Sequence, residues 1–215
     1  MEQALAQQAL ALLGLASGAP ADVQGGPTRL QAMIDGLDTL RDLLSEKCDV
    51  EAKYQELLEQ HPWMLGGMHS EVARHRAYDD RSIPDFTAER CYDGCHDIIE
   101  LKQPFLKLFR KDAGYTSAFN DAWNQAERYL TFATQQRSYL REEKELRFEN
   151  PRCLLILGYH LQEHELREIR KKESLGRAIS VFTYDHLLET VTDRPMRSGC
   201  DRPSGSSPDR PSRAT

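Results

Sequence analysis

The sequence predicts an α/β domain with a mixed β-sheet flanked by helices. Three candidate strands come first and are separated by turn residues. Helical patterns then alternate with short apolar runs, and the run at 152–159 is apolar on both faces, as a central strand should be. The predicted order is strand 71–78, strand 82–91, strand 95–102, helix 116–143, strand 152–159, helix 163–173 and strand 178–183.

Residues 1–45 are predicted to form an N-terminal helical extension. Residues 1–15 favour a helix, and the glycines and prolines of residues 16–27 form a linker. Thr28 is expected to cap a second helix that ends near Leu44 and carries apolar residues at three- and four-residue spacing. This stripe is expected to be core or a partner surface. We therefore expect the extension to serve regulation or assembly, and the protein to be a homo-oligomer.

The main domain is predicted to span residues 46–192. A third helix at 50–60 opens it and stops at His61-Pro62, because a residue before proline disfavours helix. From Asp193 onward, four of the chain's ten prolines lie among Ser, Gly, Arg and Asp. Residues 193–215 are therefore predicted to be a disordered tail.

The composition favours one cytoplasmic domain. With 215 residues, 40% of them hydrophobic, the chain can bury one good core. No apolar run approaches the roughly 20 residues needed to cross a bilayer, so we expect no membrane partner. The chain begins Met-Glu-Gln without a basic and apolar leader, and five cysteines, an odd number, do not suit a disulfide framework. A reducing cytoplasm is the expected compartment.

The distribution of charge is compatible with a nucleic-acid partner. The 28 Lys and Arg against 34 Asp and Glu give a net charge of −6, which alone argues against such a partner. Residues 1–60 hold ten acids and four bases, so the whole excess lies there, and residues 61–215 balance at 24 of each sign. The main domain is neutral overall and can carry a local basic face.

The candidate site combines Asp85 on one predicted strand with Glu100 and Lys102 on the next. Asp93 and Gly94 between the strands are a strong hairpin signal, and a two-residue loop there sets Asp85 opposite Lys102. Side chains alternate faces along a strand, so Glu100 shares that face. A loop of odd length or a bulge would turn Asp85 away. The sequence thus predicts two carboxylates and one ammonium that converge.

This set of groups indicates metal-assisted hydrolysis of a phosphodiester. Two clustered carboxylates repel each other unless a cation lies between them, and hard oxygen ligands suit Mg²⁺ or Mn²⁺. Such an ion polarises a phosphoryl oxygen and lowers the pKa of a water molecule. Lys102 can hold that water in line or offset charge that develops on the phosphate.

The spacing of Asp85, Glu100 and Lys102 resembles the PD-(D/E)xK nuclease superfamily. The segment Gln125-Ala-Glu-Arg-Tyr129 is similar to the QxxxY element of its RecB-like branch. Two further motifs, His61-Pro62-Trp63-Met64-Leu65-Gly66 and Glu100-Leu101-Lys102-Gln103-Pro104, make the chain most similar to the Shedu family of bacterial antiphage nucleases. The resemblance covers roughly residues 50–190.

This resemblance implies a restriction-endonuclease-like fold and a metal-dependent endonuclease or nickase that acts on DNA in antiphage defence. It implies that Asp85, Glu100 and the backbone carbonyl of Leu101 are metal ligands. Lys102 is then the catalytic lysine. A catalytically silent nucleic-acid-binding module and a DNA repair nuclease on the same fold remain alternatives.

The resemblance also implies roles for two predicted helices. Gln125 and Tyr129, four residues apart, are expected to face the site, where Gln125 could orient Lys102 or the scissile phosphate. Glu56 in the helix at 50–60 is a weaker candidate for a further metal ligand. The other carboxylates that compete for this role are Glu51 and Glu59.

Two remaining groups of residues have more than one interpretation. Cys91, Cys95 and His96 could indicate zinc, but a structural zinc ion normally needs four ligands and a second pair is missing. A run of bases before Gly114 is either a solvated surface or a contact to the DNA backbone, and its place beside the candidate site favours phosphate contact. These bases are Lys107, Arg110 and Lys111.

Overall fold

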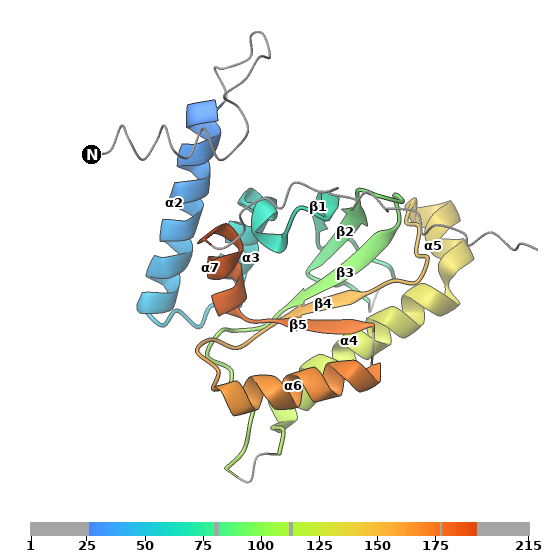
Figure 1. Ribbon diagram of the computed structural model, residues 1–215. Coiled ribbons are helices and arrows are strands. Elements are labelled where there is room, and N and C mark those ends of the chain that lie inside the picture. Colours follow the sequence, from blue (N-terminus) through green and yellow to red (C-terminus); the bar gives the residue numbers. More distant parts are fainter. Residues whose placement is uncertain (1–25, 80–81, 112–113, 177, 193–215) are drawn as a thin grey trace, which may run out of the picture. The chain divides into compact units, whose positions relative to one another are not determined.

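The computed structural model describes residues 26–79, 82–111, 114–176 and 178–192 (Figure 1). The predicted helix at 1–15, most of the linker and the predicted tail at 193–215 lie outside the described residues. The elements are α2 (Gly26–Ser45), α3 (Glu51–Gln60), η1 (Pro62–Leu65), β1 (His69–Arg74), β2 (Phe86–Arg90), β3 (His96–Leu101), α4 (Ser117–Gln135), α5 (Arg137–Lys144), β4 (Cys153–Ile156), α6 (Glu163–Gly176), β5 (Ile179–Phe182) and α7 (Tyr184–Thr192).

The strands form one mixed sheet in the order β1-β2-β3-β4-β5. The first three strands pair antiparallel, whereas β4 joins β3 and β5 joins β4 in parallel. Parallel neighbours need a crossover connection, which α4 with α5 and then α6 supply. The predicted mixed sheet flanked by helices is confirmed, and β4, from the apolar run at 152–159, is an interior strand as predicted.

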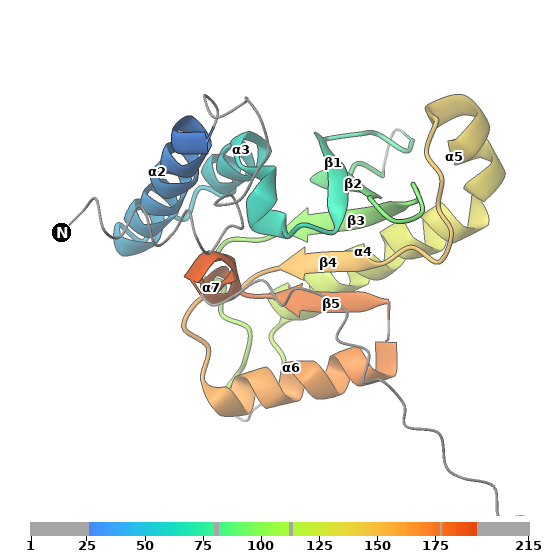
Figure 2. The same cartoon turned by 45° about the horizontal axis from the view of Figure 1, so that its top comes forward.

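Helices cover both faces of the sheet (Figures 1 and 2). Ile98 of β3 packs into a buried cluster with Phe119 and Trp123 of α4. The next residue, Ile99, packs into a second cluster with Tyr54 of α3 and residues of α2 and α7. This alternation follows from the two-residue period of a strand, so Glu100 leaves β3 on the same side as Ile98.

The turn between β2 and β3 differs from the prediction. Phe86 pairs with Ile99, and the amide of Arg90 donates to the carbonyl of Cys95, so the loop has the four residues 91–94 and the predicted two-residue loop is wrong. The Asp93 carboxylate accepts from the Cys95 amide at 3.0 Å, which closes the longer turn. Because both loop lengths are even, the strands keep their faces.

The helices also differ from the prediction in three respects. The single helix predicted at 116–143 is interrupted at Gln136, where no glycine or proline marks a stop. The second helix begins at Gly26, before the predicted cap at Thr28. The last helix, α7, was not predicted, although the Thr183 hydroxyl accepts a hydrogen bond from the His186 amide in the manner of a helix cap.

Helix α2 contributes to the core of the described residues. Leu40 and Leu44 are buried in the same cluster as Tyr54, whose hydroxyl donates to the carbonyl of Cys48 at 2.8 Å. The part of the predicted extension that α2 forms is therefore packed against the main domain. Among the residues that the structure describes, no helix combines the length and the apolar character needed to span a membrane.

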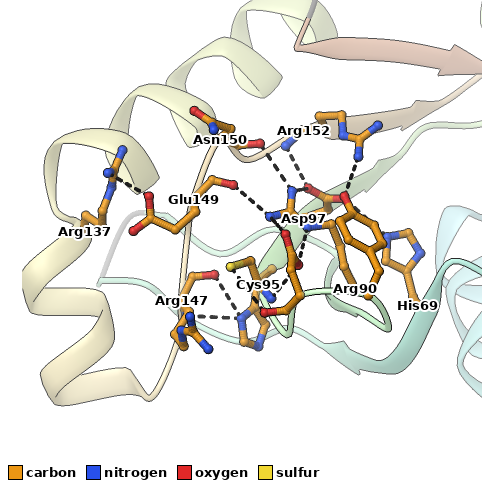
Figure 3. A network of polar contacts seen from close by, with 12 residues as sticks. His69, Arg90, Cys95, Asp97, Arg137, Arg147, Glu149, Asn150 and Arg152 are labelled. Carbon is orange, nitrogen blue, oxygen red and sulfur yellow. Dashed lines mark hydrogen bonds and ion pairs between the residues drawn. The ribbon is translucent and has the colours of Figure 1, made fainter.

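A polar network anchors the β2–β3 turn to the segment before β4 (Figure 3). At its centre the buried Arg90 guanidinium donates to both carboxylate oxygens of Asp93 and, at 3.2 Å, to Asp97. It also donates to the backbone carbonyls of Glu149 and Asn150. A planar guanidinium with five donors can satisfy all these acceptors at once.

We predict that Arg90→Met lowers the free energy of unfolding by about 3 kcal/mol, because it leaves the buried Asp97 carboxylate without its cation. Urea denaturation followed by circular dichroism measures the change. Arg141→Met is the matched control, since Arg141 and Glu142 form an ion pair with side chains 63% and 66% exposed. Its cost is expected to stay below about 0.5 kcal/mol. Equal costs for both variants would contradict a structural role for the network.

Candidate active site

Asp85, Glu100 and Lys102 meet at the carboxyl end of β3. The Lys102 ammonium donates to Glu100 Oε1 at 2.7 Å, and the Asp85 amide lies 3.4 Å from Glu100 Oε2. Glu100 is 2% exposed and Asp85 9%, whereas the Lys102 side chain is 21% exposed. The register of the hairpin sets Asp85 at the level of Glu100, two residues from the predicted pairing with Lys102. The structure brings all three side chains together.

The two carboxylates raise each other's energy when both are ionised. Burial raises the pKa of Glu100 to about 7, and the nearby Asp85 carboxylate adds to this rise while Lys102 opposes it. Burial also raises the pKa of Asp85, although the Leu101 amide and Lys102 act against it. Burial alone would lower the pKa of Lys102, but the carboxylates of Glu100, Glu51 and Asp85 together outweigh it and the pKa is raised. The site thus has an excess of negative charge that one ammonium only partly offsets.

Asp85 is held by hydrogen bonds from two sides. Its Oδ2 accepts from the Leu101 amide at 2.7 Å, and its Oδ1 accepts from the Gln55 side chain of α3, also at 2.7 Å. Arg74 of β1 in turn donates to Gln55 Oε1 at 3.1 Å and to Glu59 at 2.9 Å. The arginine fixes which end of the Gln55 amide faces Asp85, so the carboxylate has one defined orientation.

Helix α3 presents residues to the site other than the predicted Glu56. The Glu56 side chain is exposed, whereas Gln55, one position earlier, is buried against Asp85. Glu51, at the start of the helix, also lies close to the site. Burial raises its pKa, Lys102 lowers it and Asp85 raises it. The rotation of α3 therefore brings Gln55 and Glu51, not Glu56, to the paired carboxylates.

Sequence reasoning missed Gln55 and Arg74, although a signal for Gln55 was present. Tyr54, Leu57 and Leu58 define the buried side of α3, and Gln55 lies at the border of that side whereas Glu56 lies beyond it. Arg74 lies at the end of β1, where buried and exposed side chains do not alternate clearly. The sequence therefore did not indicate that its side chain points toward the site.

Gln125 and Tyr129 lie together on α4, as their four-residue spacing predicts. The Gln125 amide donates to the Tyr129 hydroxyl at 2.8 Å, and that hydroxyl donates to the carbonyl of Ile83 at 3.0 Å. Burial raises the pKa of Tyr129, and the Glu100 carboxylate raises it further, which places the ring within electrostatic reach of the site. The observed bond of Gln125 goes to Tyr129 and not to Lys102.

The backbone around Lys102 is tied to both neighbouring elements. Its amide donates to Ile156 of β4, and its carbonyl accepts from the Tyr184 hydroxyl of α7 at 2.7 Å. Leu101 is fully buried, with its amide bonded to Asp85. Tyr184 was not among the predicted site residues because the helix that carries it was not predicted.

The three basic residues predicted to contact phosphate line one pocket with Phe109 and three residues of α6. These basic residues are Lys107, Arg110 and Lys111. Bonds from Thr116 to the carbonyls of Lys107 and Leu108 order the loop. Glu165 and Glu168 line the same pocket and offset part of its positive charge. The loop therefore holds the three basic side chains together, next to the carboxylates of Glu165 and Glu168.

The donors available for a metal ion are limited in number. Across the described ranges, no three His, Cys, Asp or Glu side chains are grouped so that they could hold an ion by themselves. At the alternative zinc position, Cys91 is exposed, Cys95 is buried and His96 Nδ1 lies 3.2 Å from the Arg147 amide. At the candidate site, two carboxylates would need a backbone carbonyl and water to complete a shell.

We predict that the Asp85→Asn substitution lowers the pKa of Glu100, since it removes a negative charge that raises it. Carbon NMR of labelled glutamate side chains, recorded without divalent ions, gives the midpoint directly. In the unchanged protein Glu100 should lose its proton as the pH rises through about 7. Glu142, exposed on α5, serves as the internal reference. An unchanged midpoint in the variant would show that Asp85 does not act on Glu100.

Comparison with known proteins identifies the family. A model described as Shedu protein SduA, C-terminal, matches residues 49–188. A search of curated proteins found no match. The matched range is more than half of the chain and contains Asp85, Glu100, Lys102, Gln125 and Tyr129. The chain therefore belongs to the family of Shedu SduA C-terminal domains.

Proposed function

We propose that this chain is a metal-dependent nuclease of the PD-(D/E)xK type that cleaves DNA as an endonuclease or nickase. The observation that carries the proposal is the buried pair of Asp85 and Glu100 with Lys102 beside it at the end of β3. Membership of the Shedu family implies a role in defence against bacteriophages and supports a nuclease.

The electrostatics of the site support a divalent cation. Burial raises the pKa of both carboxyl groups, and Asp85 raises that of Glu100 further, so the pair gains more from a divalent ion than from a shared proton. Asp85, Glu100 and the Leu101 carbonyl would hold Mg²⁺ or Mn²⁺, and Glu51 on α3 is a further carboxylate that interacts electrostatically with the site. The ion, when bound, polarises a phosphoryl oxygen and lowers the pKa of a water molecule.

The side chains around the carboxylates have separate tasks in this proposal. Lys102, held by Glu100, presents an ammonium that can stabilise charge developing on the phosphate. Gln55 and Arg74 orient the Asp85 carboxylate. Tyr129, supported by Gln125, fixes the chain at Ile83 just before Asp85. Each role is supported by an observed hydrogen bond. The proposed reaction needs no covalent intermediate.

We predict that Asp85→Asn and Lys102→Met both reduce cleavage strongly, but for different reasons. Asp85→Asn removes a charge from the ligand set, so it should weaken Mg²⁺ binding as well as cleavage. Lys102→Met leaves both carboxylates and removes a competing cation, so metal affinity should hold or rise while cleavage falls roughly 10²-fold or more. Calorimetric titration of metal and nicking of plasmid DNA measure the two effects.

Glu56→Gln is the matched control for the ligand role, because this carboxylate is exposed on the same helix as Gln55. It should change neither measurement. Near-normal nicking by Lys102→Met, or normal metal binding and cleavage by Asp85→Asn, would show that this cluster is not the active site. Metal binding without cleavage of any DNA in the unchanged protein would instead favour a catalytically silent module.

A second prediction concerns the DNA-contacting role of Lys107, Arg110 and Lys111. Replacing all three by Ala should weaken DNA binding and flatten its dependence on salt, since each phosphate contact releases condensed counterions. Fluorescence anisotropy across a series of salt concentrations measures the slope. Arg167→Ala with Lys171→Ala on α6 is the control, because those bases are paired with Glu163 and Glu168 at the surface. An unchanged slope in the triple variant would assign these bases to ordinary surface charge.

A further inference from the structure

Three aromatic rings gather where the chain leaves β3 and β4, and we call Phe105, Tyr159 and His160 the aromatic platform. Phe105 is 39% exposed, Tyr159 is half-buried and His160 is exposed. The Phe105 and Tyr159 rings meet edge to face at 5.9 Å, and the Tyr159 and His160 rings stack at 3.8 Å. The platform is not used by the chemistry described above.

The platform is connected to Lys102 through the backbone. Phe105 follows Lys102 by three residues, which span at most about 11 Å. The chain turns at residues 103–106, where the Leu106 amide donates to the Gln103 carbonyl. Tyr184 connects the Tyr159 and His160 segment to Lys102. Its hydroxyl donates to the Lys102 carbonyl, and its amide donates to the carbonyl of Gly158, one residue before Tyr159.

Tyr159 packs against the buried cluster that contains Tyr54 and Tyr184, and hydrogen bonds hold its loop in position. Gly158 and His160 both have positive φ angles, of 81° and 54°, and the second is uncommon for a residue with a side chain. Asp185 stabilises this conformation, since it accepts from the His160 amide at 2.8 Å and lies 2.9 Å from His160 Nδ1. The loop thus has an uncommon backbone conformation at His160, and Phe105 and His160 stay exposed beside the half-buried Tyr159.

We infer that the aromatic platform binds an unpaired base of the DNA strand next to the scissile phosphate, an inference that rests on the proposed nuclease function. Exposed aromatic faces stack on bases of any sequence. Lys102 and Lys107 lie before and after Phe105 in the chain and supply positive charge for the adjoining phosphates. The substrate strand would therefore need to be single-stranded or locally unpaired at the site.

The test uses a short single-stranded DNA that carries 2-aminopurine, whose fluorescence falls when it stacks on a ring. The full chain with Lys102→Met binds this DNA without cutting it, and Phe105→Leu with Tyr159→Leu is added to it. The double substitution should abolish the quenching and weaken binding roughly 10-fold, with the salt slope unchanged. Tyr139→Leu is the control, because this ring is also exposed, at 40%, but lies on α5.

The outcomes separate this inference from the proposed nuclease. Quenching that persists unchanged in the double variant overturns the platform, whether or not the unchanged protein nicks DNA. Loss of quenching in the double variant, together with no cleavage of DNA by the unchanged protein, supports the platform and overturns the nuclease. Loss of self-association in the double variant, with quenching unaltered, would assign the rings to a contact between two copies. If the double variant does not fold, Phe105→Leu alone gives the same readings.

Discussion

The repulsion between Asp85 and Glu100 is the constraint on which the rest of the site depends. Burial raises the pKa of both carboxyl groups, and the Asp85 charge raises that of Glu100 further, so bringing them together opposes folding at neutral pH. The fold opposes this repulsion with donors from several elements: the Leu101 amide, the Gln55 amide and the Lys102 ammonium. A site that is unfavourable in the free protein is well suited to a ligand that carries two positive charges.

Packing keeps this arrangement in place. Ile98 and Ile99 hold β3 between two buried clusters, so Glu100 has no freedom to leave the sheet. Arg90 fixes the other end of the hairpin, where it joins the turn to the segment before β4. The strands carry the carboxylates, and α3 and α4 carry the residues that orient them. The charged groups thus come from the strand ends, and the residues that orient them come from the helices that cover the sheet.

The sequence predicted the sheet and the convergence of Asp85, Glu100 and Lys102, because strand alternation depends only on whether the turn has an even number of residues. It did not predict which residue of α3 faces the site, since Gln55 and Glu56 differ by about 100° around the helix and the apolar pattern leaves Gln55 at its border. Nor did it predict Arg74, whose contacts come from tertiary packing.

The hydrogen bond between Tyr184 and the carbonyl of Lys102 joins residues that lie 82 positions apart. During synthesis the ribosome releases both carboxylates and the lysine long before it releases α7. A nascent chain that ends before Tyr184 contains every charged group of the site but lacks the hydroxyl that bonds to the Lys102 carbonyl. Completion of the site therefore coincides with the emergence of the last described helix, which delays its full assembly until translation of the domain is finished.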